Sequence, residues 1–245
     1  QKEIDKRKDF RSITTFTIDP FDAKDFDDAL SFQILENGNY EIGIHIADVS
    51  FYVRPDSAIE EEAQRRTTSV YLVDRTIPML PEVLSNSLCS LRPNEEKLTY
   101  SAIFEIQPDG TVVDEWFGRT IIESNKRFTY EEAQENIDNQ SGDYFDVLTT
   151  LNNLAKIYTK ERLEEGAMEI DSQEVSFLLD EEGHPIKVQK KHRIDTNRLI
   201  EEFMLLANKK VAAFMAKRTQ RSIFVYRVHD TPDTERMQEL RMFLK

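Results

Sequence analysis

Apolar residues alternate with polar ones through much of the first half of the chain, which is the pattern of half-buried β-strands. The β-branched and aromatic run at 13–18 predicts one strand. The runs at 29–35 and 40–49 flank Asn37-Gly38, a pair that favours a tight hairpin turn. We therefore expect these two runs to pair, with one face of the second strand formed by Tyr40, Ile42, Ile44 and Ile46.

The same alternation predicts two further hairpins. Residues 98–106 and 111–122 flank a Pro-Asp-Gly turn, and residues 175–179 and 186–188 flank a Glu-Glu-Gly turn. Residues 222–228 predict one more strand. Strands therefore dominate the first half of the chain and recur near its end.

Two pairs of residues have the spacing of a capping box, in which a hydroxyl and a carboxylate three residues apart close the start of a helix. Ser57 with Glu60 predicts a helix through about Ser69. Thr129 with Glu132 predicts a second, short helix.

Longer helices are predicted in the second half of the chain. Residues 144–163 and 196–217 carry broad apolar stripes at helical spacing, which is typical of helices packed on a core. Thr231-Pro232 predicts a final helix with proline at its first position. Strands and helices interleave without a strict βαβ order. The expected fold class is therefore α+β, a mixed, largely antiparallel sheet with packed helices.

Composition narrows the class of protein. The 245 residues include 32 Lys and Arg against 46 Asp and Glu, a net charge of −14 that by itself repels nucleic acid. No apolar run approaches the roughly 18 residues of a membrane span, so no membrane partner is expected. The single cysteine, Cys89, excludes a disulfide framework and predicts a cytoplasmic protein. The charged start at 1–11 and the amphipathic end suggest a piece of a longer protein.

The most informative segment is 19–28, which holds five aspartates and one lysine between two predicted strands. Carboxylates this close repel one another unless they are solvated, protonated or neutralised by cations. Mg²⁺ takes oxygen ligands and keeps waters that a substrate phosphate can displace. A solvated acidic loop is the simpler alternative for such a segment. The interspersed apolar residues favour a loop held against the core, namely Ile18, Phe21, Ala23, Phe26, Ala29 and Leu30.

A calcium-binding EF-hand is the rival metal site, and its spacing fails. Counted from Asp25, Glu36 falls at the twelfth place, but Leu30 stands where the sharp turn requires glycine. Ala29 also occupies a ligand position. An irregular loop that binds Mg²⁺, with Mn²⁺ as an alternative, is the better prediction.

Six ordered motifs resemble the catalytic domain of the ribonuclease II / ribonuclease R (RNB) exoribonucleases, and the detail is closer to bacterial ribonuclease R. They cover nearly the whole chain. The motifs are DAKDFDDA at 22–29, GIHIADV at 43–49, SVYL at 69–72, PMLP at 78–81, LIEEFMLLAN at 199–208 and YRVHD at 226–230. Pro20-Phe21 departs from the family's usual Gly-Glu, which is expected to alter the loop geometry and not the ligands.

The resemblance implies that residues 1–245 are the N-terminal part of an RNB catalytic domain. The family's cold-shock-like domains, its S1 domain and its later arginine-containing motif are not in this sequence. It implies processive 3′-to-5′ hydrolysis of single-stranded RNA to nucleoside 5′-monophosphates, with metal ions as cofactor. The implied metal ligands are Asp19, Asp25, Asp27 and Asp28, of which Asp27 and Asp28 are also assigned to catalysis. No obligate protein partner is implied.

The resemblance also implies four residues that contact RNA. Tyr71 matches a tyrosine that stacks on a base near the catalytic centre, and Phe177 matches an aromatic residue of a clamp. Tyr130 and Glu202 correspond to residues near the terminal ribose, although Glu201 competes with Glu202 for that assignment. Core packing is the alternative for Phe177, and an exposed helix carboxylate is the alternative for Glu202.

Two other functions stay open. The chain could bind RNA without turnover, because the later arginine motif is missing, or it could be a Mg²⁺-dependent phosphoesterase of small molecules. Of the remaining residues, His45 is expected to be a packed or hydrogen-bonded side chain, and Cys89 to be buried and inert. The basic run at 187–193 is either a phosphate contact or a solvated hairpin edge.

Overall fold

The computed structural model of the chain describes residues 2–168, 175–180, 182–190, 192–218, 224–228 and 230–244. Two compact units can be distinguished, Gln1–Ala207 and Asn208–Lys245. The first unit contains every strand of the described chain and all of the residues assigned to the site from the sequence. The second holds the end of one long helix and a short terminal helix. The prediction of a single domain over 1–245 stays a prediction.

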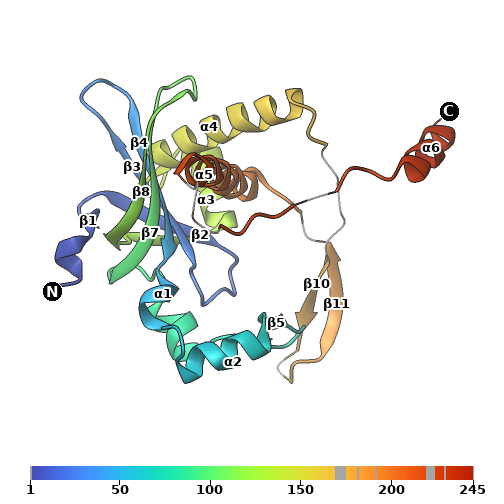
Figure 1. The fold of residues 1–245 in the computed structure, drawn as a ribbon, viewed down its shortest axis with the longest axis horizontal. Helices are drawn as coiled ribbons and strands as arrows, with labels where there is room; N and C mark the ends of the chain where they lie inside the picture. The colour runs from blue at the N-terminus through green and yellow to red at the C-terminus, as the bar shows by residue number, and fades with distance from the viewer. Residues whose placement is uncertain are drawn as a thin grey trace. The chain divides into compact units, whose positions relative to one another are not determined.

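A seven-stranded mixed sheet forms the centre of the first unit (Figure 1). Its order is β1-β8-β7-β4-β3-β2-β9, in which β1 runs parallel to β8 and β9 runs parallel to β2, while the other neighbours are antiparallel. The predicted α+β class, with a mixed and largely antiparallel sheet, is confirmed. The strands are Lys8–Asp9 (β1), Thr14–Asp19 (β2), Asp28–Ile34 (β3), Tyr40–Ala47 (β4), Glu96–Ile106 (β7), Val112–Glu123 (β8) and Lys126–Thr129 (β9).

The predicted hairpins are present with the expected turns. β3 pairs with β4 from Asp28 opposite Ile46 to Ile34 opposite Tyr40. Gly38 lies in the turn with φ +83°, a left-handed conformation that glycine adopts without strain. One detail differs from the expectation: Ile42 and Ile44 are buried, but Ile46 is exposed because the end of β4 runs beyond the core. The opposite face of β4 is buried as well, through His45.

Helices form where the spacing and the capping residues predicted them. The box at Thr129 is complete, since its hydroxyl accepts from the Glu132 amide and Glu132 accepts from the Thr129 amide. At Ser57 only half of the box forms, because the Glu60 carboxylate binds the Asp56 amide instead. The helices of the first unit are Val49–Tyr52 (α1), Ala58–Arg66 (α2), Tyr130–Asn139 (α3), Phe145–Glu164 (α4) and the first part of Asp195–Arg218 (α5).

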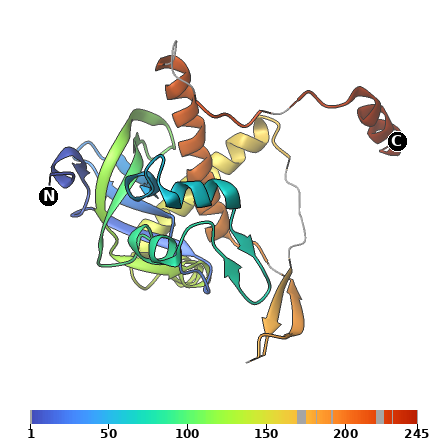
Figure 2. The same cartoon turned by 60° about the horizontal axis from the view of Figure 1, so that its bottom comes forward.

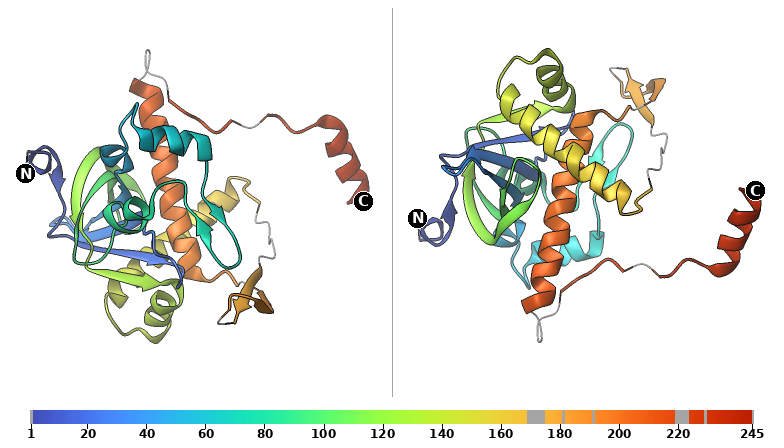
Figure 3. Two further views of the ribbon diagram at one scale, coloured as in Figure 1. Left: turned by 90° about the horizontal axis from the view of Figure 1, so that it is seen from below. Right: turned by 90° about the horizontal axis from the view of Figure 1, so that it is seen from above.

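The sheet has a hydrophobic cluster on each face. One cluster joins the sheet to α3, α4 and the start of α5, which cross beside it in Figure 3. The other joins the sheet to α1 and to a short helical turn at Leu84–Leu88 (η2). Cys89 lies in this second cluster, where burial raises the pKa of its thiol to about 11, so it is buried and protonated as expected. The sheet is therefore covered on both faces around the end of β2.

Two small hairpins stand outside the main sheet, as the teal and light orange arrows of Figure 2 show. Val70–Tyr71 (β5) pairs with Thr76–Ile77 (β6), and Val175–Leu179 (β10) pairs with Pro185–Lys190 (β11). The second pair confirms the third predicted hairpin. Apolar side chains of both hairpins are exposed. Neither hairpin therefore has a large hydrophobic core of its own.

The second unit corrects two expectations. Residues 224–228 form no regular element, whereas a strand was expected at 222–228; Ser222 and Ile223 lie outside the described residues. Val225 and Val228 are exposed, and β-branched residues alone make no strand without a neighbouring strand to pair with. The final helix, Thr234–Phe243 (α6), begins after Asp233, whose carboxylate accepts from the Glu235 and Arg236 amides. Pro232 therefore precedes the cap instead of opening the helix.

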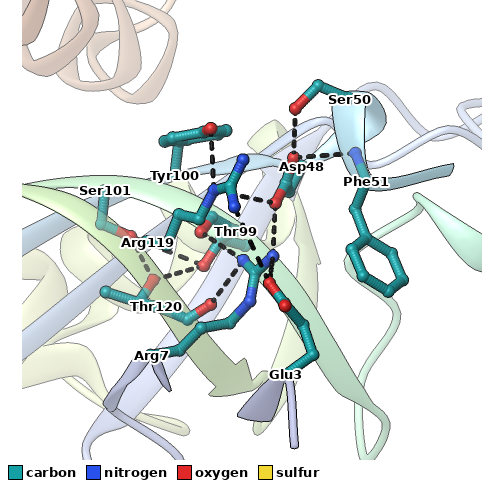
Figure 4. A network of polar contacts seen from close by, with 10 residues as sticks. All are labelled: Glu3, Arg7, Asp48, Ser50, Phe51, Thr99, Tyr100, Ser101, Arg119 and Thr120. Atoms are coloured by element: carbon teal, nitrogen blue, oxygen red, sulfur yellow. Dashed lines mark hydrogen bonds and ion pairs between the residues drawn. The ribbon is translucent and has the colours of Figure 1, made fainter. Parts of the chain in front are cut away.

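A buried polar network links the N-terminal segment to the sheet (Figure 4). Arg7, next to the helical turn Ile4–Lys6 (η1), contacts Asp48 and donates to the carbonyls of Thr99 and Thr120. His45 bonds to Ser31 and Ser101 on the same face of the sheet. Burial lowers the pKa of His45 to about 3, so it stays neutral, as a packed side chain should.

No helix in the described ranges is long and apolar enough to cross a membrane.

Candidate active site

The aspartate-rich segment links the end of one central strand to the start of its neighbour. Asp19 is the last residue of β2, and Asp28 is the first residue of β3. Residues 20–27 between them are irregular, as expected, but Asp28, which was expected on the same irregular loop, belongs to β3. The sheet thus fixes the two outer aspartates, while Asp25 and Asp27 depend on the path of the loop, which we call the aspartate loop (20–27).

Hydrogen bonds hold the second half of the aspartate loop. The hydroxyl of Ser90 accepts from the Phe26 amide and donates to the Lys24 carbonyl. The Leu91 amide donates to the Phe26 carbonyl, and the Ala47 amide donates to the Asp27 carbonyl at 3.0 Å. Phe26 packs against the second hydrophobic cluster. Phe21, also expected to face the core, is instead 83% exposed because it lies at the outer bend of the loop.

Three carboxylates of this segment have raised pKa values. Burial, and then the charges of Asp19 and Asp27, raise the pKa of Asp28 to about 7. Burial, together with the charges of Asp27 and Asp25, raises the pKa of Asp19 to about 6, against the opposing effects of the Thr17 hydroxyl and then of the Arg127 charge. The pKa of Asp27 is raised by loss of water around its carboxylate and by Asp25, although part of the residue reaches solvent. The four side chains are therefore close enough to repel one another.

This donor set suits a hard divalent cation. The Oδ2 atom of Asp19 is buried and accepts no hydrogen bond from the described residues. Carboxylate oxygens are the ligands that Mg²⁺ and Mn²⁺ take, and a bound cation would remove the repulsion that raises the pKa values. In the described part of the chain, no three acidic, histidine or cysteine side chains converge on one point. The assignment of Asp19, Asp25, Asp27 and Asp28 as metal ligands stays a prediction.

Tyr130 lies beside Asp19, at the end of β2, and Asp28, at the start of β3. β9 pairs in parallel with β2, with Thr129 opposite Asp19, so the start of α3 is set next to the end of β2. Burial, and then the charges of Asp28 and Asp19, raise the pKa of Tyr130 to about 12. The phenol is therefore protonated at neutral pH and can donate a hydrogen bond toward the cluster. Of the residues expected near the ribose, Tyr130 is the one that the fold brings to the aspartates.

An open cleft of about 500 Å³ lies against the aspartate loop. Asp22, Lys24 and Asp25 line one side, and residues of the segment 69–86 line the other. Tyr71 belongs to β5 at the start of that segment, and 70% of its surface is exposed. It lies outside the lining of the cleft itself. A ring this exposed contributes little to the core, which leaves it available for stacking.

The remaining two predicted RNA contacts differ in their relation to the cleft. Phe177 lies on β10, opposite Val188 of β11, in a hairpin separate from the main sheet, and Leu179 of the same strand lines the cleft. Glu202 is only 4% exposed and pairs with Arg162 of α4, so the alternative of an exposed helix carboxylate is wrong. Glu201, one residue earlier, lies nearer the surface and pairs with Arg193. The RNA contacts of Phe177 and Glu202 stay predictions.

One residue of this region was not anticipated from the sequence. Arg127 of β9 donates through Nη2 to the carbonyls of Pro20 and Phe21, and so binds the first half of the aspartate loop. The sequence offers only a basic pair, Lys126-Arg127, before a capping box. Its relation to residue 20 depends on the parallel pairing of β9 with β2, which joins segments more than 100 residues apart and leaves no local signal.

Comparisons with known proteins agree with these motifs. The RNB domain matches residues 7–245. The DIS3-like exonuclease 2 of Schizosaccharomyces pombe is 43% identical over 260 aligned residues, which cover 100% of this chain and 28% of that protein. Ribonuclease R 1 of Lactococcus lactis is 40% identical over 247 residues, 97% of this chain and 30% of that protein. The two identities differ too little to place the chain nearer to ribonuclease R than to the DIS3-like exonucleases. The closer likeness to bacterial ribonuclease R therefore stays a prediction.

The structure of Mycoplasma genitalium RNase R in complex with ribose-methylated single-stranded RNA superposes with a TM-score of 0.89 at 29% identity. It covers 98% of this chain and 38% of that one. An Arabidopsis thaliana relative, described as inactive exonuclease DIS3L2, is 38% identical over 259 residues, 99% of this chain and 24% of that protein. The chain thus spans less than a third of the length of these curated relatives. The motifs, the fold and the family match together show that the chain belongs to the RNB domain family.

Proposed function

We propose that this chain is part of a processive 3′-to-5′ exoribonuclease that hydrolyses single-stranded RNA to nucleoside 5′-monophosphates with divalent metal ions. The observation that carries the proposal is the aspartate cluster, whose raised pKa values and unpartnered Asp19 oxygen both call for a cation. The family supplies the reaction class. Cytoplasmic location is part of the same proposal and rests on the single cysteine.

Each site residue has a role that its environment supports. Asp19, Asp25, Asp27 and Asp28 would hold Mg²⁺ or Mn²⁺, which would activate a water molecule and neutralise charge on the scissile phosphate. Tyr130, protonated at neutral pH, can donate to a ribose or phosphate oxygen at the 3′ end. Asp28, whose pKa is about 7, can take up a proton near neutral pH when no cation is bound.

The substrate class fits the surface around the cluster. The cleft beside the aspartate loop is open to solvent, so an extended single strand can enter it without a rearrangement of the protein. Tyr71 offers an exposed ring, and stacking on a ring tolerates every base. The net charge of −14 opposes RNA at long range, and cations at the aspartates would reverse that field where the phosphate binds.

A chain that binds RNA without turnover is the second candidate. Two observations favour it: an inactive relative is 38% identical over nearly the whole chain, and the described acidic side chains do not converge on one point. In that case the aspartates keep the fold of the family and RNA is held by the surrounding surface alone. Catalytic competence therefore has to be measured on this chain.

The test uses single-stranded RNA labelled at its 5′ end, incubated with the purified chain and Mg²⁺. Stepwise shortening from the 3′ end with release of nucleoside 5′-monophosphates, abolished in Asp27→Asn, is the result expected of the nuclease. Binding of the same RNA without release of mononucleotides would instead support the second candidate. Hydrolysis of a simple phosphate monoester with indifference to RNA would replace both by a phosphoesterase.

A further inference from the structure

The first half of the aspartate loop is held from one side by a single residue, Arg127. Its Nη2 atom donates to the carbonyl of Pro20 at 2.5 Å and to that of Phe21 at 3.0 Å. The loop contacts from Ser90, Leu91 and Ala47 all fall on residues 24–27. The other hydrogen bond seen at Pro20 comes from the Ala23 amide within the loop itself.

The pairing of the strands explains why Arg127 reaches this loop. β9 runs parallel to β2 with Arg127 opposite Thr17 and Thr129 opposite Asp19. Residues two apart on a strand point to the same face, so Arg127 lies on the face from which Asp19 projects. The guanidinium can then extend past the end of β2 to the first carbonyls of the loop. Its central carbon also lies 5.5 Å from the ring centroid of Phe26.

The charge of Arg127 acts on Asp19, the first aspartate of the cluster. In the described chain, no carboxylate lies within ion-pairing distance of its guanidinium, while the five aspartates of 19–28 lie around the same loop. Its positive charge opposes the rise in the pKa of Asp19 that burial causes. Arg127 therefore fixes the path of the first half of the loop backbone and places a positive charge near Asp19, at the start of the cluster.

We propose that Arg127 is a positioning residue that fixes the first half of the aspartate loop, and that the placing of the loop carboxylates around a divalent cation depends on this support. This inference rests on the proposed function, because the cation is part of that function. It assigns the role to the planar guanidinium, which can donate to two adjacent carbonyls, and not to positive charge alone. Arg127 touches neither the substrate nor the reacting atoms in this assignment.

Two measurements on the 245-residue chain test the assignment. Hydrogen exchange without metal reports the protection of the loop amides at 21–27, and electron paramagnetic resonance reports the affinity for Mn²⁺ alone. The variants are Arg127→Ala and Arg127→Lys. Lys126→Ala is the matched control, since it removes the same charge from the same strand but pairs with Asp143 and not with the loop.

Arg127→Ala is expected to speed exchange in the loop while the strands stay protected, and to weaken Mn²⁺ binding about 10- to 100-fold, the usual effect of removing a residue that supports metal ligands. Arg127→Lys is expected to fall between Arg127→Ala and the unchanged chain, and Lys126→Ala to match the unchanged chain. Unaltered exchange and Mn²⁺ affinity in Arg127→Ala would overturn the proposal. Arg127→Lys behaving as the unchanged chain would also overturn it, because charge would then suffice.

Arg127→Lys also decides the case if Arg127→Ala fails to fold, since lysine keeps the charge and most of the stem. The two readouts separate this inference from the proposed function. If the unchanged chain binds no Mn²⁺, the metal-dependent function fails, and the exchange of the loop amides still judges Arg127. If Mn²⁺ binds and the loop exchanges normally in Arg127→Ala, the inference fails and the function stands.

Discussion

The guanidinium of Arg7 lies 2.6 Å from the carboxylate of Asp48, and solvent reaches neither side chain. Asp48 also caps α1, accepting from the Phe51 amide and from the Ser50 hydroxyl. The contact therefore fastens the N-terminal segment to the end of β4. The preceding residue, Ala47, binds the carbonyl of Asp27, so the pair lies one residue from a support of the candidate site.

Removing either partner of this pair should destabilise the chain. We expect Arg7→Ala to lower the free energy of unfolding by about 3–5 kcal/mol, because it leaves the buried Asp48 carboxylate with only the longer, 3.9 Å ion pair to Arg119. Arg11→Ala breaks a more exposed ion pair and should cost less than about 1 kcal/mol. Urea denaturation measures both. Equal decreases in the free energy of unfolding in the two variants would show that the buried pair stabilises the chain no more than the exposed one.

The raised pKa values predict how stability varies with pH. Asp28 has a pKa of about 7 in the folded chain, against 3.8 for an ordinary aspartate, so the folded chain binds more protons than the unfolded chain between these values. The contribution of Asp28 to the free energy of unfolding should therefore fall as the pH rises from about 4 to about 7.

The measurement compares thermal midpoints of the metal-free chain and of Asp28→Asn across that range. The difference between the two proteins cancels the titrating groups that do not interact with Asp28, including His45, whose lowered pKa acts in the opposite direction. The thermal midpoint of Asp28→Asn should rise relative to that of the unchanged chain as the pH rises. A constant difference across the range would show that Asp28 does not titrate as described.

Asp27→Asn tests the assignment of this residue to metal binding and catalysis. The substitution keeps an oxygen ligand and the side-chain shape but removes a charge, so hydrolysis in an active form of the protein should fall by about 10² or more. RNA affinity should stay equal or rise, because repulsion of the phosphates decreases. Single-turnover cleavage, RNA affinity and thermal midpoint are measured on the same preparation. Near-normal cleavage by a folded variant would defeat the assignment.

Tyr71→Ala should weaken the binding of short RNA ends by about 1–3 kcal/mol, the contribution of one stacked base. The ring is largely exposed, so the thermal midpoint should hardly change. Val70→Ala, on the same strand and also exposed, is the control. RNA affinity measured by fluorescence anisotropy separates the two. The same affinity for both variants would leave Tyr71 without a role in RNA binding.

Local signals predicted local structure well. Asn37-Gly38 joined β3 to β4, and the box at Thr129 opened α3 as the spacing required. The box at Ser57 was only half right because Glu60 found a nearer amide, that of Asp56. Pro232 was assigned inside a helix whose cap is one residue later, at Asp233, since both residues are common at helix starts.

Features that depend on distant pairing were harder to predict. The parallel neighbours β1 with β8 and β9 with β2 join remote segments, so no local pattern announces them. The choice between Glu201 and Glu202 depended on which of two adjacent carboxylates faces α4. The aspartates themselves were found from their clustering, because charge density needs no knowledge of the fold. The hydrogen bonds by which Arg127 supports the loop were not predicted from the sequence.

The four aspartates of the candidate site divide between paired strands and an irregular loop. Asp19 and Asp28 belong to paired strands, so a change in their backbone would disturb the sheet. Asp25 and Asp27 belong to the loop, whose path can change while every strand keeps its register. An altered loop could thus abolish a reaction and leave a stable protein. Relatives that keep this architecture without activity could arise in evolution through a few substitutions at this one connection.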